Sequence, residues 1–330
     1  MIIINYLFTA SWFLPLRILL SIIYGSVIRA RNLFYDRGIF KTHGVATPVI
    51  SVGNLSTGGS GKTILVQALI EYFKDLQKIP SVLSRGYGRS SKGLFLVSDK
   101  SRLKGDPFTA GDEAFLIAKN HPGVPVVVTE DRVIGARYLQ DHFSPDVIIL
   151  DDGFQHRRLH RDLNILLLDQ PGDQVGHLLP WGKFREPFSG LDRADLTLFS
   201  KAGRQKSSNL NLHFDLAENV VDQAGNKHAL SSLKGSFGLF AGLGNPHHFF
   251  ESVQQHHRSA KARIIFSDHT LYGPKQLDQI SRISCAYWIT TQKDFIKLEP
   301  GFCQAQNIYF IHVKTALPSP LIALLKQNFN

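Results

Sequence analysis

The run VGNLSTGGSGKT, which ends at Thr63, has residue types that could hold a phosphate group. It meets the phosphate-loop pattern G-x-x-x-x-G-K-[ST] except at the first glycine, where the chain has Ser56. Gly58 and Gly59 lie just inside the run and can supply the positive φ angles of a tight turn. Lys62 would neutralise phosphate charge, and the Thr63 hydroxyl would bind Mg²⁺. We therefore predict a nucleotide-binding loop made of Ser56, Thr57, Gly58, Gly59, Ser60, Gly61, Lys62 and Thr63.

The stretches on both sides of this loop determine whether it can act as a phosphate cradle. TPVISV, residues 47–52, predicts a strand, and KTILVQALIEYF, residues 62–73, has apolar side chains at helical spacing. A strand, a glycine-rich loop and a helix together direct backbone N–H groups and the helix dipole at an anion. The alternative is a glycine-rich turn that only begins a helix. The flanking elements favour nucleotide binding.

Two carboxylates follow a second apolar stretch, PDVIILDD, which ends at Asp152. A phosphate loop requires an acidic residue at the end of a neighbouring strand to hold the metal ion or its water. Aspartates also cap helices and form turns after strands, which is the structural alternative. Because the strand before them reads as fully buried, we expect Asp151 and Asp152 to serve the metal.

The elements that must position these groups form an α/β protein. Short Val/Ile/Leu runs alternate with helical patterns and predict a P-loop NTPase-type parallel-sheet domain at residues 41–206. Residues 207–234 are polar and contain VVDQAGNKHAL, whose Gly-Asn turn predicts a β-hairpin linker. A second alternating set predicts a smaller α/β domain at residues 235–330. The chain has two cysteines, Cys285 and Cys303, at no metal-binding spacing, which indicates a reducing compartment.

The amino-terminal segment is the outlier in composition. Its first 28 residues carry one charge, Arg17, and one proline, Pro15, with neither the basic start nor the cleavage site of a secretory signal. A wide apolar face and a thin polar arc suit a helix that lies in the membrane interface. A spanning helix and an apolar helix packed on the protein's own core are the alternatives. We predict that residues 1–40 form a membrane-associating segment. The polar arc consists of Arg17, Ser21, Gly25, Arg29, Asn32 and Asp36.

The formal net charge of +10 implies an acidic partner: nucleic acid, nucleotide or an anionic membrane surface. A GTPase would carry an N-K-x-D stretch, and TQKD resembles it only superficially because Gln292 stands in place of the lysine. A nucleic-acid motor would not explain the apolar amino terminus. A kinase that acts on an acidic, membrane-resident acceptor explains the loop, the charge and this segment together. The alternative is a membrane-associated P-loop ATPase or an ATP-dependent binding module.

Several blocks of the chain resemble one known family. SVGNLSTGGSGKT, LSRGYGR, GDEA, DDGFQHRRLHRDLNILLLD, LLPWGKFREP, AGLGNPHHFF, FSDHTLYG and TTQKDFIKL are similar, in order, to blocks of the tetraacyldisaccharide 4′-kinase family of Gram-negative bacteria. The resemblance covers residues 48–298. It implies transfer of the γ-phosphate of ATP, with Mg²⁺, to the 4′-hydroxyl of an acylated glucosamine disaccharide 1-phosphate, which gives lipid IVA. It further implies a monotopic enzyme on the cytoplasmic face of the inner membrane. We expect a monomer that binds no nucleic acid.

The resemblance also assigns roles to residues. Asp112 matches the general base and His269 its partner, while Arg185 and Glu186 match active-site residues beside the phosphates. With Lys62 of the phosphate loop, Asp112, His269 and Arg185 are the expected catalytic residues. Where the family usually has a second histidine, this chain has Thr270, so that position's role is in doubt. A helix N-cap is the structural alternative for Asp112, and an ordinary surface histidine is that for His269. The metal ligands implied are Thr63, Glu113, Asp151, Asp152 and Glu186.

Overall fold

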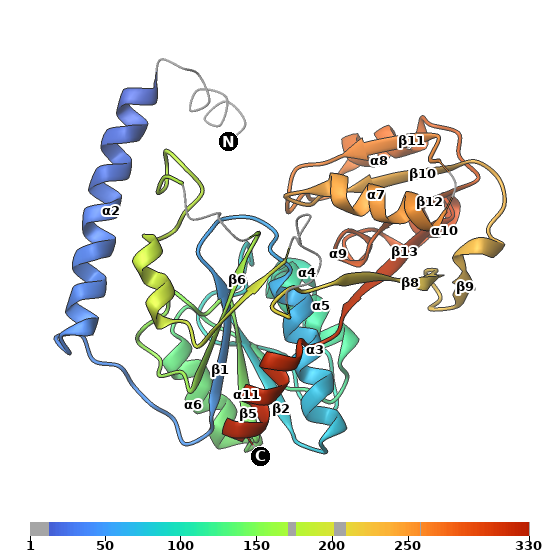
Figure 1. Cartoon of the computed structure of the whole chain (residues 1–330). Helices are drawn as coiled ribbons and strands as arrows, with labels where there is room; N and C mark the ends of the chain where they lie inside the picture. The colour runs from blue at the N-terminus through green and yellow to red at the C-terminus, as the bar shows by residue number, and fades with distance from the viewer. Residues whose placement is uncertain (1–12, 171–175, 201–208, 258, 330) are drawn as a thin grey trace. The chain divides into compact units, whose positions relative to one another are not determined.

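The computed structural model describes residues 13–170, 176–200, 209–257 and 259–329, and the chain divides into two compact units (Figure 1). The first unit is made of residues 1–85, 129–213 and 317–330, and the second of residues 86–128 and 214–316. The segment expected to form the first domain, residues 41–206, therefore contributes to both units. Residues 86–128 group with carboxyl-terminal elements because long-range packing, which local patterns do not encode, holds them there.

Parallel strands form the sheet of the first unit. They lie in the order β2 (Pro80–Ser84), β5 (Val147–Asp151), β1 (Val49–Asn54), β6 (Leu163–Leu168) and β7 (Leu196–Phe199). Every residue of β1, β2, β5 and β6 is buried, which explains why these strands read as continuous apolar runs in the sequence. The predicted parallel α/β sheet is confirmed.

Helices pack on this sheet, and one of them comes from the carboxyl-terminal end of the chain. The helix α3 (Lys62–Asp75) buries Leu65, Leu69 and Phe73 completely or nearly so, and α6 (Arg132–Phe143) follows β4 in the sequence. The last helix, α11 (Ser319–Phe329), returns to the first unit, where the rings of Phe329 and Phe73 meet edge to face at 6.0 Å. A short 3₁₀ helix, η2 (Phe188–Arg193), precedes β7.

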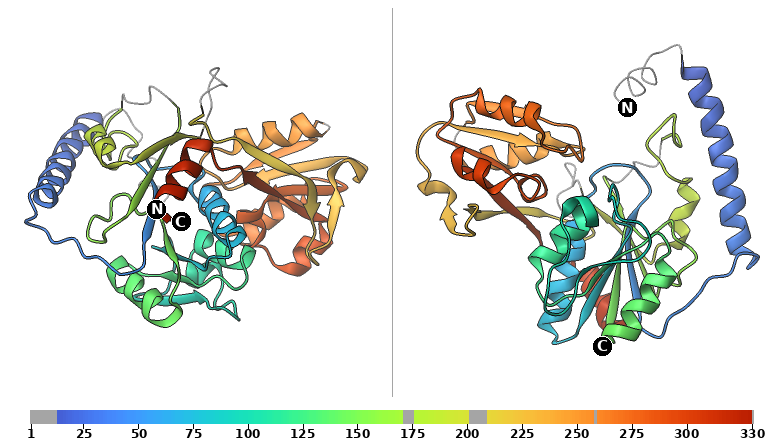
Figure 2. Two further views of the ribbon diagram at one scale, coloured as in Figure 1. Left: turned by 60° about the horizontal axis from the view of Figure 1, so that its bottom comes forward. Right: turned by 180° about the vertical axis from the view of Figure 1, so that it is seen from behind.

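The amino-terminal helix α2 (Leu14–Asp36) is turned with its polar arc toward the protein. Its buried residues are Ser21, Gly25 and Ile28, and the helix runs alongside the segment at residues 176–193 (Figure 2). Pro15 lies in its first turn, where proline is tolerated, so this residue does not kink the helix. Large apolar side chains on the other side are exposed: Leu16, Leu19, Ile22, Ile23 and Val27.

Among the helices of the described residues, none combines the length and the apolar character that crossing a membrane requires.

The second unit contains a mixed sheet in the order β11 (Ala262–Ile265), β10 (Phe237–Ala241), β12 (Tyr287–Thr291), β13 (Ile308–Thr315), β8 (Phe214–Val221) and β9 (Lys227–Ala229). The first four strands are parallel, and β13, β8 and β9 pair antiparallel. The predicted hairpin is β8–β9, and Gly225 in its turn has φ of +85°. Because β8 pairs with β13, this hairpin extends the sheet of the second unit.

Helices and an antiparallel strand pair complete the second unit. Its helices are α4 (Pro107–Ala110), α5 (Asp112–Asn120), α7 (Pro246–His256), α8 (Pro274–Ser281), α9 (Gln292–Phe295), α10 (Pro300–Ala305) and the 3₁₀ helix η3 (Leu230–Ser232). The strands β3 (Phe95–Ser98) and β4 (Val126–Val128) pair antiparallel. Reciprocal amide hydrogen bonds of 2.9 and 2.6 Å between Asn120 and Gln292 join α5 to α9. The two halves of the unit, distant in sequence, are thus joined at the carboxyl-terminal end of α5.

The close approach of Gly53 to Phe154 gives a test of the packing under the phosphate loop. A Cβ atom at Gly53 would lie 2.5 Å from the Phe154 Cβ and 2.9 Å from its backbone nitrogen. We therefore expect Gly53→Ala to lower the free energy of unfolding by about 1–3 kcal/mol in denaturant titrations. Gly44→Ala, whose Cβ would meet nothing within 4 Å, is the matched control and should be neutral. Equal stability of the two variants would contradict the packing described.

Candidate active site

The phosphate loop joins β1 to α3 with the geometry that an anion requires. Gly61, the N-cap of α3, has a left-handed backbone with φ of +81°, and Gly58 has φ of +124°. No side chain caps the first turn of α3, and that turn contains no acidic residue. The amides of the helix N-terminus and the dipole therefore face no competing carboxylate of their own helix. This arrangement suits a phosphate group.

Ser56 fits the place where the common pattern has glycine. Its φ is not positive, and it forms a β-bridge with Phe184. The next residue continues this contact, because the Thr57 amide donates to the Lys183 carbonyl at 2.8 Å. The segment around residues 183–185 thus supports the loop from the side. A glycine is unnecessary at position 56 because the backbone there takes an ordinary conformation.

Lys62 and Arg185 converge on one carboxylate, that of Asp152. The Lys62 Nζ lies 3.5 Å from Asp152 Oδ1, and the Arg185 Nη1 lies 2.9 and 2.7 Å from the two carboxylate oxygens. Burial acts to raise the pKa of Asp152, but the charges of Lys62 and Arg185 outweigh it, so the pKa is lowered. Among these three side chains, two cations and one carboxylate leave one positive charge in excess.

Asp151 has a different environment from that of Asp152. It is completely buried at the end of β5, and its Oδ2 accepts a hydrogen bond of 3.3 Å from Ser84. The register of the sheet pairs Asp151 with Val52, in the strand β1 that leads into the phosphate loop. The two neighbouring carboxylates therefore differ: one lies inside the sheet, and the other pairs with the cations of the loop.

The residues around the loop fit a magnesium ion that is completed by its substrate. No group of three or more His, Cys, Asp or Glu residues that could hold a metal occurs in the described part of the chain. Mg²⁺ in phosphoryl-transfer sites usually takes one or two carboxylates together with substrate phosphates and water. The Thr63 hydroxyl and the carboxylates after β5 are oxygen donors of this kind. A complete cage of protein ligands is therefore not needed.

Glu186 is engaged by neighbouring side chains. It is completely buried, and it accepts from Arg193 Nη2 at 2.7 Å, Gln155 Nε2 at 2.9 Å and Asn32 Nδ2 at 3.2 Å. These donors come from η2, from the segment after β5 and from α2. The Glu186 carboxylate thus joins these three segments next to Arg185. Its predicted role as a metal ligand stays a prediction.

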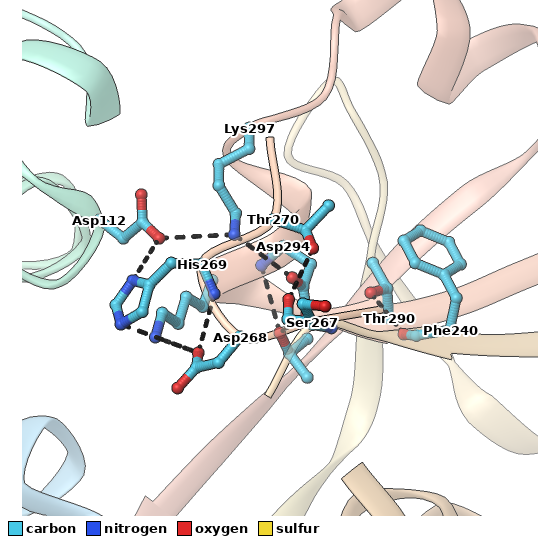
Figure 3. Close-up of polar contacts among 12 residues, drawn as sticks. Asp112, Phe240, Ser267, Asp268, His269, Thr270, Thr290, Asp294 and Lys297 are labelled. Carbon is cyan, nitrogen blue, oxygen red and sulfur yellow. Dashed lines mark hydrogen bonds and ion pairs between the residues drawn. The ribbon is translucent and has the colours of Figure 1, made fainter. Parts of the chain in front are cut away.

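Asp112 lies at the first position of α5 and does not cap that helix. The N-cap is Gly111, with φ of +88°, and no side chain caps this helix end. The Asp112 Oδ2 instead contacts His269 Nδ1 at 3.2 Å and Lys297 Nζ at 3.4 Å (Figure 3). The capping alternative for Asp112 therefore has no support in its geometry. The two residues that the resemblance pairs, Asp112 and His269, lie in contact within the second unit.

The backbone and the surroundings of His269 set its position. Its φ of +58° is left-handed, a conformation that is sparsely populated outside glycine and recurs at functional sites. Its Nε2 lies 3.8 Å from Asp268 Oδ1, and its ring lies 5.1 Å from that of Tyr87. Thr270, where the family has a second histidine, donates a 2.6 Å hydrogen bond to the Ser267 carbonyl. This bond is internal to the turn that carries His269.

Charges around Asp112 favour its ionised form. Burial, the largest influence, acts to raise the pKa of Asp112. The hydrogen bond from His269 and the charges of Lys297 and Lys293 overcome burial, so the pKa is lowered. Glu113 beside it pairs with Lys293 at 3.7 Å, and Lys293 also contacts Asp268 at 3.1 Å. Asp112 is therefore a carboxylate at neutral pH, ready to accept a proton.

Sequence reasoning found most of these residues and missed the lysines. The structure brings Lys62, Asp152 and Arg185 together in the first unit, and Asp112, His269 and Glu113 in the second. Lys293 and Lys297 were given no role, although both lie in the block TTQKDFIKL. Their spacing of four residues was the available signal, because it can place two side chains on one face of a helical turn.

His156 gives a pH test of the segment after Asp152. Burial, the largest influence, and the charge of Arg132 lower the pKa of His156 from 6.5 to about 4. The unfolded chain then binds this proton more readily than the folded protein, so the free energy of unfolding should decrease as pH falls from 6.5 to 4. The decrease from this group is at most about 3 kcal/mol. Denaturant titrations should show that the free energy of unfolding depends less on pH in His156→Gln than in the parent. The control His142→Gln, at an exposed position, should follow the parent. Indistinguishable curves for His156→Gln and the parent would refute the prediction.

Comparisons with known proteins show which family this chain matches. The sequence profile of LpxK, described as Tetraacyldisaccharide-1-P 4′-kinase, matches residues 12–330. The Tetraacyldisaccharide 4′-kinase of Aquifex aeolicus is 38% identical over 313 residues, which cover 90% of this chain and 92% of that protein. The protein of the same description from Geobacter metallireducens is 36% identical over 324 residues, covering 93% and 95%.

A solved structure agrees with the sequence comparisons. The crystal structure of the "apo" form of LpxK from Aquifex aeolicus in complex with ATP superposes with a TM-score of 0.80 at 35% identity. The alignment covers 97% of this chain and 99% of the other. The sequence and the fold therefore agree over nearly the whole length, and the chain belongs to the tetraacyldisaccharide-1-P 4′-kinase family.

Proposed function

We propose that this protein transfers the γ-phosphate of ATP to the 4′-hydroxyl of tetraacyldisaccharide 1-phosphate, the step that forms lipid IVA in lipid A biosynthesis. Membership of the family over residues 12–330 supports this reaction. In the reaction, a bond forms between the 4′-oxygen and the γ-phosphorus, and the bond between that phosphorus and the bridging oxygen of ADP breaks. The proton of the hydroxyl passes to a base.

The observation that carries this proposal is the ionised carboxylate of Asp112 in contact with His269. A sugar hydroxyl is a weak nucleophile, and a positioned base contributes about 10²–10⁴-fold in rate. A binding module has no need of such a base. Asp112 takes the proton of the 4′-hydroxyl, and the 3.2 Å contact with His269 Nδ1 orients the carboxylate.

Lys62 and Arg185 act on the phosphates. Both lie against Asp152, and a triphosphate at the loop would supply further negative charge for the same two cations. The uncapped first turn of α3 holds the phosphates through backbone amides. A bound Mg²⁺ would neutralise charge that develops on the phosphate oxygens, with Thr63, Asp151 and Asp152 as its candidate ligands.

The main alternative is a membrane-associated ATPase or binding module without lipid kinase activity. The experiment that decides is transfer of label from γ-labelled ATP to the disaccharide 1-phosphate in detergent, with GTP as the comparison nucleotide. The proposed function requires labelled lipid and a preference for ATP. Release of labelled phosphate without labelled lipid would support the ATPase.

We further propose that α2 lies on an anionic membrane surface on the cytoplasmic side, where ATP is available. Its apolar side chains point away from the protein, with Leu19, Ile22 and Val27 being 54%, 58% and 60% exposed. A contiguous apolar face of this kind indicates a membrane or a protein partner. Basic residues in the last two turns of the helix and just after it suit anionic headgroups: Arg29, Arg31, Arg37 and Lys41.

Replacing the proposed base should separate catalysis from binding. We expect Asp112→Asn to lower kcat for lipid phosphorylation by about 10²–10⁴-fold, because the amide cannot take the proton. The Kd for ATP, measured by calorimetry, should stay within about twofold of the parent. Lys62→Ala is the comparison and should weaken ATP binding as well as turnover. If Asp112→Asn lost ATP binding to the same degree, the assignment of Asp112 as base would be wrong.

Polar substitution on α2 should weaken membrane binding without unfolding the protein. In the double variant Leu19→Ser/Ile23→Ser we expect at least about tenfold weaker partitioning onto vesicles with anionic lipid, measured by flotation. Removal of residues 1–30 should weaken it further. The control Ile134→Ser removes an apolar side chain that is 55% exposed on α6 and should partition like the parent. Unchanged partitioning of the double variant would exclude this face as the membrane contact.

A further inference from the structure

Lys297 is a buried cation in contact with the proposed base. Its side chain is 3% exposed, and its Nζ lies 3.4 Å from Asp112 Oδ2 and 3.5 Å from Asp294 Oδ1. Figure 3 shows Lys297 between the two carboxylates, and His269 contacts the same oxygen of Asp112. A lysine that is buried to this extent is rare unless it is paired.

The second partner of Lys297 is buried and hydrogen-bonded on its own account. Asp294 is completely buried, and its Oδ2 accepts from the Gly242 amide at 3.0 Å and from the Thr291 hydroxyl at 2.7 Å. The Lys297 ammonium also lies 5.6 Å from the centre of the Tyr272 ring. Thus the residue after β10 and the last residue of β12 hold the Asp294 carboxylate in place, and Lys297 lies between it and Asp112.

Both nitrogen contacts of Asp112 fall on the same carboxylate oxygen. His269 Nδ1 and Lys297 Nζ contact Oδ2, whereas no polar contact to Oδ1 occurs within the described part of the chain. A carboxylate that makes a hydrogen bond and an ion pair through one oxygen cannot rotate freely about its Cβ–Cγ bond. The other oxygen is then directed to one place, where it can accept a proton.

We propose that Lys297 is a positioning residue for phosphoryl transfer: together with His269 it fixes Oδ2 of Asp112 so that Oδ1 receives the proton of the acceptor hydroxyl. This inference rests on the proposed function. It differs from a purely structural role, in which Lys297 would only neutralise Asp294 and hold α9 in place. In the positioning role, its loss matters only while Asp112 is a functioning base.

A double-mutant cycle separates these two roles. We expect Lys297→Met to lower kcat by about 10–100-fold, because a small misplacement of a catalytic group has effects of this size. The Kd for ATP should stay within about twofold. In the Asp112→Asn background, the same substitution should lower kcat no further, since the group that Lys297 positions no longer acts as a base. Lys297→Arg keeps the charge but shifts it, and we expect an intermediate loss of about fivefold.

The controls distinguish three outcomes: a variant that does not fold, a parent protein without lipid kinase activity, and a Lys297 that has no positioning role. Lys261→Met removes a lysine whose Nζ donates to the Ser284 carbonyl in the same unit, and it should retain the parent kcat. Thermal unfolding is measured for every variant; if Lys297→Met does not fold, the cycle is run with Lys297→Arg. An unchanged kcat, or an equal loss in both backgrounds, would overturn the positioning role. Absence of lipid phosphorylation in the parent protein would instead overturn the proposed function.

Discussion

Carboxylates removed from water must be paired with cations or hydrogen-bond donors, and this requirement organises the candidate site residues within each unit. Asp112 is held by His269 and Lys297, Asp152 by Lys62 and Arg185, and Glu186 by Arg193 with two amides. Removing one member of such a pair leaves an uncompensated buried charge, which is strongly destabilising. The partners therefore restrict each carboxylate to one geometry. Preorganised charges of this kind need little rearrangement when a substrate arrives.

The same pairing joins the amino-terminal helix to the phosphate loop. Tyr24 donates to the Arg185 carbonyl at 2.6 Å, and Asn32 donates to Glu186 at 3.2 Å, so α2 holds the backbone and the side chain of two successive residues. Arg185 in turn contacts Asp152, which pairs with Lys62. The polar arc of α2 is thus needed on the protein side, which leaves the apolar side chains facing outward. A helix of this kind can contact lipid and remain part of the folded unit.

Local signals in the sequence predicted the elements of the site better than its contacts. The flanks of the phosphate loop and the buried strands were readable because strand and helix periodicities are local. The resemblance to the family supplied Asp112 and His269. The contacts of Lys297 were not readable, since they depend on how α5, the turn at residues 266–273 and the segment after α9 pack together. The polar arc of α2 was recognised, but only its partners at residues 178–186 determine which way it faces.

The charges that keep Asp112 ionised also make it a weaker base, and its fixed position in the site offsets this loss of basicity. A lowered pKa means that the carboxylate holds a proton poorly in the resting protein. The acceptor hydroxyl, however, becomes far more acidic as its oxygen bonds to the phosphorus, so the proton need not be removed before that bond begins to form. A base that is always ionised and directed by two fixed contacts is then more useful than a stronger base that is partly protonated. Positioning by His269 and Lys297 compensates for the low basicity that their own charges impose.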